Sequence, residues 1–132
     1  MLEVAYYTHP VPAESKPIVW MGDSLGVLRG FPDEVKYIMG FALRRAQEGK
    51  KHEQARPLRG FGGAGVLEVV RDFDGNAYRA VYTVKLPGVV YVLHAFQKKS
   101  KRGVATPKAE TDLVKSRLKM AQEAHAAMES EK

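Results

Sequence analysis

The chain has 132 residues, enough for one domain with a hydrophobic core of its own. Hydrophobic residues make up 45% and charged residues 27%, as in ordinary globular proteins, and no apolar run approaches the roughly 20 residues of a membrane span. The absence of cysteine excludes disulfides and thiolate metal sites, while a net charge of +6 favours nucleic acid or an acidic protein as the partner.

The N-terminal segment predicts an arm followed by a short strand. Residues 1–15 contain Pro10 and Pro12 and show little periodicity, so we expect an irregular arm. They also lack the basic region and long apolar core of a signal peptide, and we therefore expect a cytoplasmic protein. Residues 17–21 are apolar and strand-like, and the turn after them, at residues 22–24, leads into a short helical turn.

Residues 33–48 show the clearest helical pattern of the chain. Pro32 suits the first turn of this helix, and Gly49 ends it. The face opposite its apolar stripe carries charged residues, Arg44 among them, which predicts a packing helix without chemistry. The stripe consists of Val35, Ile38, Met39, Ala42, Leu43 and Ala46.

A long polar and glycine-rich connection follows at residues 49–65. Loops of this length are uncommon in compact domains and are often functional. Arg59 is one of several cations in this segment. Leu58 and Phe61 are apolar, and we expect them to pack onto the core.

From residue 66 onward the pattern is that of a β-meander. Residues 66–73, 76–86 and 89–97 are strand-like, and turn residues at 74–76 join the first two into a hairpin. The third run is almost unbroken in β-branched, aromatic and bulky residues. That pattern predicts a strand buried on both faces.

The chain ends in a predicted helix. Thr106 is expected to cap it and Pro107 to occupy its first position. An apolar stripe continues from Val114, and residues 129–132 are expected to fray. The whole chain, residues 1–132, is thus predicted as a single α+β domain. Its small antiparallel sheet is mainly a three-stranded meander plus an N-terminal strand, with N-terminal helices and a C-terminal helix.

Familiar catalytic motifs do not occur in the sequence. It has no GxxxxGK phosphate loop, no HExxH pair and no serine in a nucleophile elbow. The four histidines are scattered, and no group of acids has the spacing of metal ligands. We therefore expect neither a metal nor a cofactor.

Cations gather behind the strand predicted at residues 89–97. Lys98, Lys99, Lys101 and Arg102 follow it with no acid among them. A buried strand would present these cations from a rigid base, which suits a polyanion. A solvated basic loop is the alternative that charge alone leaves open.

Arg79 and His94 are polar residues inside apolar strands, and each has two interpretations. A buried arginine must find a partner or face a cleft. Arg79 either pairs with Glu68 across the hairpin or clamps a phosphate with its planar fork. His94 is either a core histidine hydrogen-bonded to a backbone carbonyl or a general acid or base.

Most of the chain resembles a known family. The runs FDGNAYRAVY at residues 73–82 and VYVLHAFQKKS at residues 90–100, followed by Thr106-Pro107, are similar to the phage-derived toxin branch of the RelE/HigB/ParE superfamily. The resemblance extends over residues 16–122. It implies a RelE-like fold, which agrees with the elements predicted from the residue patterns.

The resemblance implies the toxin of a bacterial type II toxin–antitoxin pair. Members are typically metal-independent endoribonucleases, many of which cut messenger RNA in the ribosome. Their partner is a small antitoxin, often a helix-turn-helix protein encoded next to the toxin. Arg79 matches a phosphate-contacting catalytic arginine of RelE-like enzymes, and Lys98 and Lys99 match the basic end of the last strand. With His94 or one of the lysines as the candidate for proton transfer, Arg79, His94, Lys98 and Lys99 form the expected catalytic set. The expected RNA-binding residues are Lys101, Arg102, Lys108 and Arg59.

The chain departs from RelE-like toxins in two places. Leu67 and Val69 stand where those toxins carry two lysines, and no residue matches their C-terminal catalytic tyrosine. The resemblance therefore assigns no general base. Two alternatives stay open: a ParE-like inhibitor of DNA gyrase without nuclease chemistry, and a phage-derived accessory protein that binds RNA or protein through a degenerate site.

Overall fold

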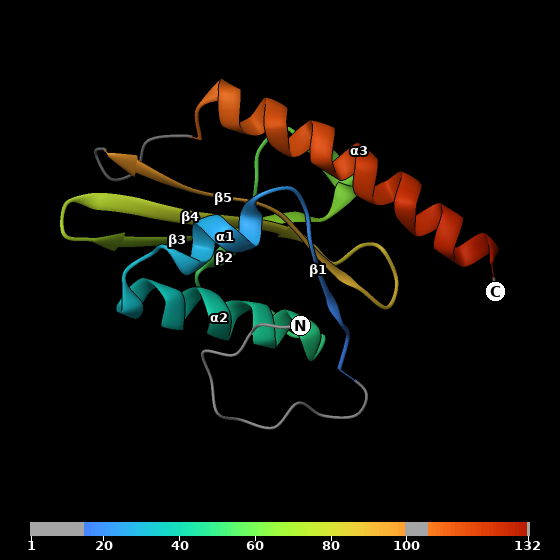
Figure 1. The fold of residues 1–132 in the computed structure, drawn as a ribbon, viewed down its shortest axis with the longest axis horizontal. Helices are drawn as coiled ribbons and strands as arrows, with labels where there is room; N and C mark the ends of the chain where they lie inside the picture. Colours follow the sequence, from blue (N-terminus) through green and yellow to red (C-terminus); the bar gives the residue numbers. More distant parts are fainter. Residues whose placement is uncertain (1–14, 100–105, 132) are drawn as a thin grey trace.

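The computed structural model describes residues 15–99 and 106–131 of the chain. These residues form a five-stranded sheet, in the order β1-β5-β4-β3-β2, with two helices on one face and a long C-terminal helix on the other (Figure 1). This arrangement confirms the predicted α+β fold. The elements in chain order are β1 (Ile18–Trp20), α1 (Ser24–Arg29), α2 (Asp33–Gln47), β2 (Ala55–Pro57), a 3-10 turn η1 (Gly62–Ala64), β3 (Val66–Phe73), β4 (Asn76–Thr83), β5 (Val90–Lys99) and α3 (Lys108–Ser130).

Positive φ angles close the hairpin between β3 and β4. Asp74 has a φ of 53° and Gly75 a φ of 81°, values that these two residue types tolerate and that suit a two-residue hairpin turn. Phe73 pairs with Asn76 across the turn, and the antiparallel register continues without interruption along both strands. The predicted hairpin is confirmed.

Two three-residue strands form the edges of the sheet. β1 lies parallel to β5, so the predicted N-terminal strand joins the sheet, but in an orientation that the sequence does not indicate. β2 lies antiparallel to β3 and falls inside the segment predicted as a long connection. Its sequence, ARP, carries no strand pattern, so pairing with β3 decides its conformation.

The helices α1 and α2 cover one face of the sheet. Pro32, predicted in the first turn, is instead the residue immediately before α2, and two acidic residues occupy the first turn. The apolar stripe of α2 is buried against Tyr82 and its neighbours on the sheet. The fully buried members of this core include Leu28, Val35, Met39, Ala42, Ala80 and Val92.

Arg44 corrects the prediction for the outer face of α2. Its side chain is buried rather than exposed, and its Nε lies 3.4 Å from Glu48 Oε2. The chain near Lys16 runs along this end of the helix, since Gln47 Nε2 donates to the Lys16 carbonyl and the Lys16 N–H donates to the Gln47 carbonyl. Arg44, which the helical period places on the outer face of α2, therefore lies at an end of the helix that the chain near Lys16 covers.

The helix α3 covers the other face of the sheet. Its start differs from the prediction: Pro107 is the residue before the first helical turn, and no side chain caps it. The Thr106 hydroxyl donates to Glu68 instead of capping the helix. The helix reaches Ser130, inside the segment expected to fray. Among the helices of residues 15–99 and 106–131, even this one with its 23 residues is too polar to cross a membrane.

A β-bulge in β5 decides which of its side chains face α3. Val81 of β4 pairs with His94, but the next residue of β4 skips one position on β5, so Leu93 is an extra residue. Leu93 and His94 therefore both face α3, and every second residue after His94 does so too. From Val90 to Phe96 the strand is buried throughout, as its composition predicts.

The buried hydroxyl of Tyr82 leads to a prediction about alkaline stability. Tyr82 is fully buried, and its hydroxyl has no hydrogen-bond partner among the described residues. Burial raises the pKa of Tyr82 to about 12. The unfolded chain loses this proton at lower pH than the folded chain, so the free energy of unfolding should fall by roughly 2–3 kcal/mol between about pH 10 and pH 12.

In Tyr82→Phe this part of the alkaline loss should disappear, and the stability near neutral pH should rise by about 1 kcal/mol or stay unchanged. Urea denaturation at several pH values measures both effects. Tyr37→Phe, which changes an exposed tyrosine, is the matched control. A Tyr82→Phe protein that loses stability with alkaline pH as steeply as the wild type would contradict the prediction.

Candidate active site

A buried carboxylate joins β3, β4 and the start of α3. Glu68 and Arg79 are 2% and 1% exposed, and Arg79 Nη1 lies 3.4 Å from Glu68 Oε2. The Thr106 hydroxyl donates to the same carboxylate oxygen at 2.7 Å and accepts from Arg79 Nη1 at 2.8 Å. The ion pair that is one interpretation of Arg79 is thus present, and Thr106 is a third member that the sequence does not reveal.

Arg56, a residue of β2, brings a second guanidinium to this carboxylate. Its Nη2 lies 3.9 Å from Glu68 Oε1, and its side chain is 60% exposed. One carboxylate therefore faces two arginines, which leaves the cluster with an excess of positive charge. Because Arg56 is exposed, an anion can approach this excess from solvent. Sequence reasoning missed Arg56 because it missed β2.

His94 lies between two charged residues of α3. Its Nε2 lies 2.6 Å from Glu110 Oε1, and its Nδ1 lies 3.2 Å from Arg117 Nη1. A guanidinium only donates, so Nδ1 accepts and Nε2 carries the hydrogen that is donated to Glu110. The buried ring also stacks on Phe96, with centroids 5.0 Å apart. His94 thus bonds to two side chains of α3, one acidic and one basic, rather than to a backbone carbonyl.

Arg117 is held in place by the turn between β1 and α1. Its Nη2 donates to Asp23 Oδ1 at 2.9 Å, and its Nη1 donates to the Leu93 carbonyl at 3.0 Å. The hydrogen bond from Arg117 lowers the pKa of Asp23. Gly22 has a φ of 55°, and a Cβ there would lie 2.6 Å from Arg117 Cζ. Glycine at this position therefore makes room for the guanidinium.

The Glu68 cluster and the His94 cluster lie next to each other on the face of the sheet that α3 covers. Arg79 pairs with Phe96 in the β4–β5 register, and His94 is two residues before Phe96 on the same side. Such diagonal neighbours lie about 7–8 Å apart in an antiparallel pair. Arg79 and His94 therefore belong to one small area of this face.

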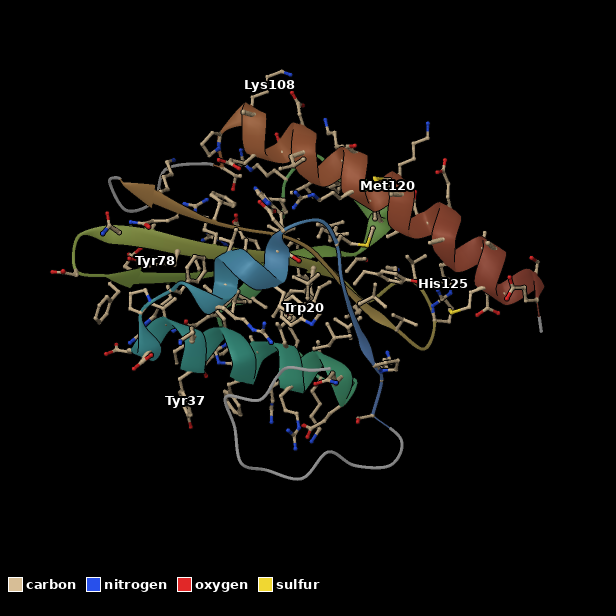
Figure 2. The ribbon with its side chains drawn as sticks, viewed as in Figure 1. Trp20, Tyr37, Tyr78, Lys108, Met120 and His125 are labelled. Carbon is tan, nitrogen blue, oxygen red and sulfur yellow. The ribbon has the colours of Figure 1, made fainter. Side chains whose placement is uncertain are left out.

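Three of the expected cations lie at the hairpin end of the sheet or at the start of α3. Lys98 faces the α3 side of the sheet, close to the β3–β4 hairpin, and Lys99 ends β5 in register with Asn76. Lys108 begins α3 and points away from the sheet (Figure 2). Its Nζ lies 2.8 Å from Asp112 Oδ2, so it is partly neutralised.

The other expected RNA-binding residues are not brought to this place. Lys101 and Arg102 lie outside the described residues. Arg59 is exposed in the loop after β2, and β2 runs towards the Val66 end of β3. Lys98 lies at the opposite, hairpin end of the sheet, so the structure does not bring Arg59 together with it.

The chemistry that these residues offer is electrostatic and acid–base. Arg79 and Arg56 supply positive charge, and the His94–Glu110 pair supplies a place for a proton. In residues 15–99 and 106–131, no three side chains of the ligand types His, Cys, Asp and Glu lie close enough to hold a metal ion.

Glu110 and Arg117 are two further site residues that the sequence prediction missed. Glu110 stands four residues before Val114 and Arg117 three residues after it, so both flank the buried stripe of α3. A charged residue beside a buried stripe is a signal for a buried polar contact. The identity of the partner, His94, comes only from the fold.

The fold and this face define a basic α+β domain of RelE type with a charged cluster between its sheet and its C-terminal helix. A family model described as Phage derived protein Gp49-like (DUF891) matches residues 27–119. Because the match covers more than half of the chain, the chain belongs to this Gp49-like family, a phage-derived, toxin-like family of the RelE/HigB type. Membership implies an antitoxin as a partner in general terms. No curated protein and no solved structure matches the chain.

Removing one partner of the buried ion pair should destabilise the fold strongly. Arg79→Ala leaves Glu68 buried without its nearest counter-charge, and we expect the free energy of unfolding to fall by about 3–5 kcal/mol. Replacing both residues, in Arg79→Met with Glu68→Leu, should cost much less than the sum of the two single changes.

The control for this prediction is Arg71→Ala, which removes a more exposed ion pair with Glu34 and should cost at most about 1 kcal/mol. Urea denaturation measures the wild type, Arg79→Ala, Arg71→Ala, the double variant and its two single changes. Equal losses for Arg79→Ala and Arg71→Ala would show that burial adds nothing to the pair.

Proposed function

We propose that this chain is the toxin of a type II toxin–antitoxin pair and acts as a metal-independent endoribonuclease on messenger RNA in the cytoplasm, free or in the ribosome. The observation that carries the proposal is the placement of Arg79 and the His94–Glu110 pair on one face of the sheet, beside the basic end of β5. Membership in a toxin-like family supports it.

The reaction is an attack by the ribose 2′-hydroxyl on the adjacent phosphorus. The bond from the 2′-oxygen to phosphorus forms, and the bond from phosphorus to the 5′-oxygen breaks, which leaves a 2′,3′-cyclic phosphate and a 5′-hydroxyl. The His94–Glu110 pair takes the proton of the attacking hydroxyl. Lys98 and Lys99 hold the RNA backbone at the end of β5.

Arg79 stabilises the charge that builds up on the phosphoryl oxygens. Its Nη1 donates to the Thr106 hydroxyl at 2.8 Å. A phosphate oxygen is a stronger acceptor for a guanidinium than a hydroxyl is, so the substrate replaces Thr106 at this nitrogen. We also propose that the activity is inhibited by an antitoxin, a helix-turn-helix protein encoded nearby.

A second candidate is an inhibitor of DNA gyrase that resembles ParE and has no nuclease chemistry. The observation in its favour is the burial of Arg79, which is 1% exposed and engaged by Glu68. In this case the cations at the end of β5 contact protein. Expression would then arrest growth with intact messenger RNA and altered DNA supercoiling, whereas the nuclease leaves cut messenger RNA.

The chemistry of the RNA ends tests the nuclease. Attack by the 2′-hydroxyl leaves a 2′,3′-cyclic phosphate and a 5′-hydroxyl, and we expect both at every cut, on free RNA or on ribosome-bound messenger RNA. Cleavage of free RNA should also continue in excess EDTA, under which a metal-dependent ribonuclease used as the control stops. Products with 5′-phosphates, or loss of free-RNA cleavage in EDTA, would refute the mechanism.

The salt dependence of RNA binding tests the basic end of β5. Each phosphate contact contributes about −0.7 to the log–log slope for single strands, so Lys98→Ala with Lys99→Ala should flatten the slope by roughly one to two units. The matched control changes Lys50 and Lys51, two adjacent exposed lysines after α2, and should leave the slope as it is. An equal effect of both double variants would mean that net charge, and not this position, sets the binding.

A further inference from the structure

We infer that Glu110 is the general base that takes the proton from the 2′-hydroxyl, and that His94 and Arg117 are positioning residues that orient its carboxylate. The inference rests on the proposed nuclease function and assigns one step of it. It changes the sequence prediction, in which His94 or a lysine moved the proton and Glu110 had no catalytic role.

His94 has no free lone pair with which to act as the base. Arg117 Nη1 donates to Nδ1 at 3.2 Å, so the only lone pair of the neutral ring points at a guanidinium. The other ring nitrogen, Nε2, carries a hydrogen and donates it to Glu110 Oε1 at 2.6 Å. The side chain of His94 is also less exposed than that of Glu110, at 7%.

Glu110 has free lone pairs and a more exposed side chain than His94. Its side chain is 32% exposed, so it is open to a substrate on one side while His94 holds it on the other. A carboxylate has about four lone-pair positions, and the hydrogen bond from His94 occupies one of them.

The support behind Glu110 is fixed by the fold. Arg117 donates hydrogen bonds to Asp23 and to the Leu93 carbonyl, and Gly22 leaves room for its guanidinium. Arg117 in turn fixes the tautomer of His94. The bulge in β5 turns His94 towards α3, where the hydrogen bond to Glu110 forms. A general base held from behind in this way needs little reorganisation when the substrate binds.

The proton balance of the step is as follows. The 2′-hydroxyl proton passes to the Glu110 carboxylate while the 2′-oxygen bonds to phosphorus. The electron pair of the breaking phosphorus–oxygen bond goes to the 5′-oxygen, which takes a proton from solvent water. Protonated Glu110 then returns its proton to solvent, so the enzyme ends unchanged.

Two amide variants separate the roles of the two residues. Glu110→Gln still accepts the hydrogen bond from His94 but cannot take a proton, so single-turnover cleavage should fall by about 10²–10⁴. His94→Gln keeps a donor for Glu110 and an acceptor for Arg117, so cleavage should stay within about tenfold of the wild type. Glu123→Gln, the same change at an exposed position of the same helix, is the matched control and should cleave like the wild type.

Three further measurements keep the result interpretable. Binding of a 2′-deoxy analogue of the RNA, which cannot react, should be unchanged in Glu110→Gln. Thermal melting should show that all three variants are folded. The imidazole nitrogen shifts of His94 should show Nε2 protonated and Nδ1 unprotonated in the wild type.

Each other pattern overturns the assignment. A large loss in His94→Gln with little loss in Glu110→Gln would make His94 the base, and small losses in both would exclude the pair. Equal large losses would mean that the proton is shared and not held by Glu110. In these cases the wild type still cuts RNA and the proposed function stands, whereas a wild type that does not cut RNA removes both proposals.

Discussion

The geometry of the site depends on the electrostatic compensation of one buried carboxylate. Placing the Glu68 carboxylate in the interior costs several kcal/mol unless charges and hydrogen bonds offset it, and Arg79, Arg56 and the Thr106 hydroxyl supply them. Because Thr106 stands just before α3, the same bonds fix where the helix begins over the sheet. Glu110, four residues after Thr106, is thereby brought to His94. The two clusters of the site are therefore not independent.

The parts of the fold that follow from local patterns were predictable, and the parts set by distant pairing were not. The turn at Asp74 and Gly75 and the stripe of α2 are encoded within a few residues, and both were predicted. The parallel orientation of β1 depends on hydrogen bonds such as the one from the Val90 N–H to the Pro17 carbonyl, between segments far apart in sequence. The strand β2 has no pattern of its own and exists through its pairing with β3.

The same division holds for the site. Arg79 and His94 stand out in the sequence because they are polar residues inside apolar strands, and Glu68 followed from the hairpin register. The partners of His94 did not follow, because strict alternation along β5 would place His94 on the side of Val90 and Val92, towards α2. The bulge at Leu93 moves His94 to the opposite face of the sheet, and no glycine or turn residue in the sequence of β5 marks the position of the bulge. One extra residue thus decides whether His94 meets α2 or α3.

The Glu68 cluster and the His94 cluster differ in how deeply their charged groups are buried, and this difference suits different roles. Arg79 and Glu68 are almost completely buried, and charges in such a place are held rigidly and are poorly screened, which suits a group that stabilises developing charge. Glu110 lies at the rim with a third of its side chain exposed, which suits a group that must receive a proton and release it to solvent. His94 lies between these two environments. Its ring is buried against Phe96, while its Nε2–H donates to the more exposed Glu110. In our inference His94 therefore acts as a fixed donor and not as a base, because the Arg117 guanidinium occupies its Nδ1 lone pair.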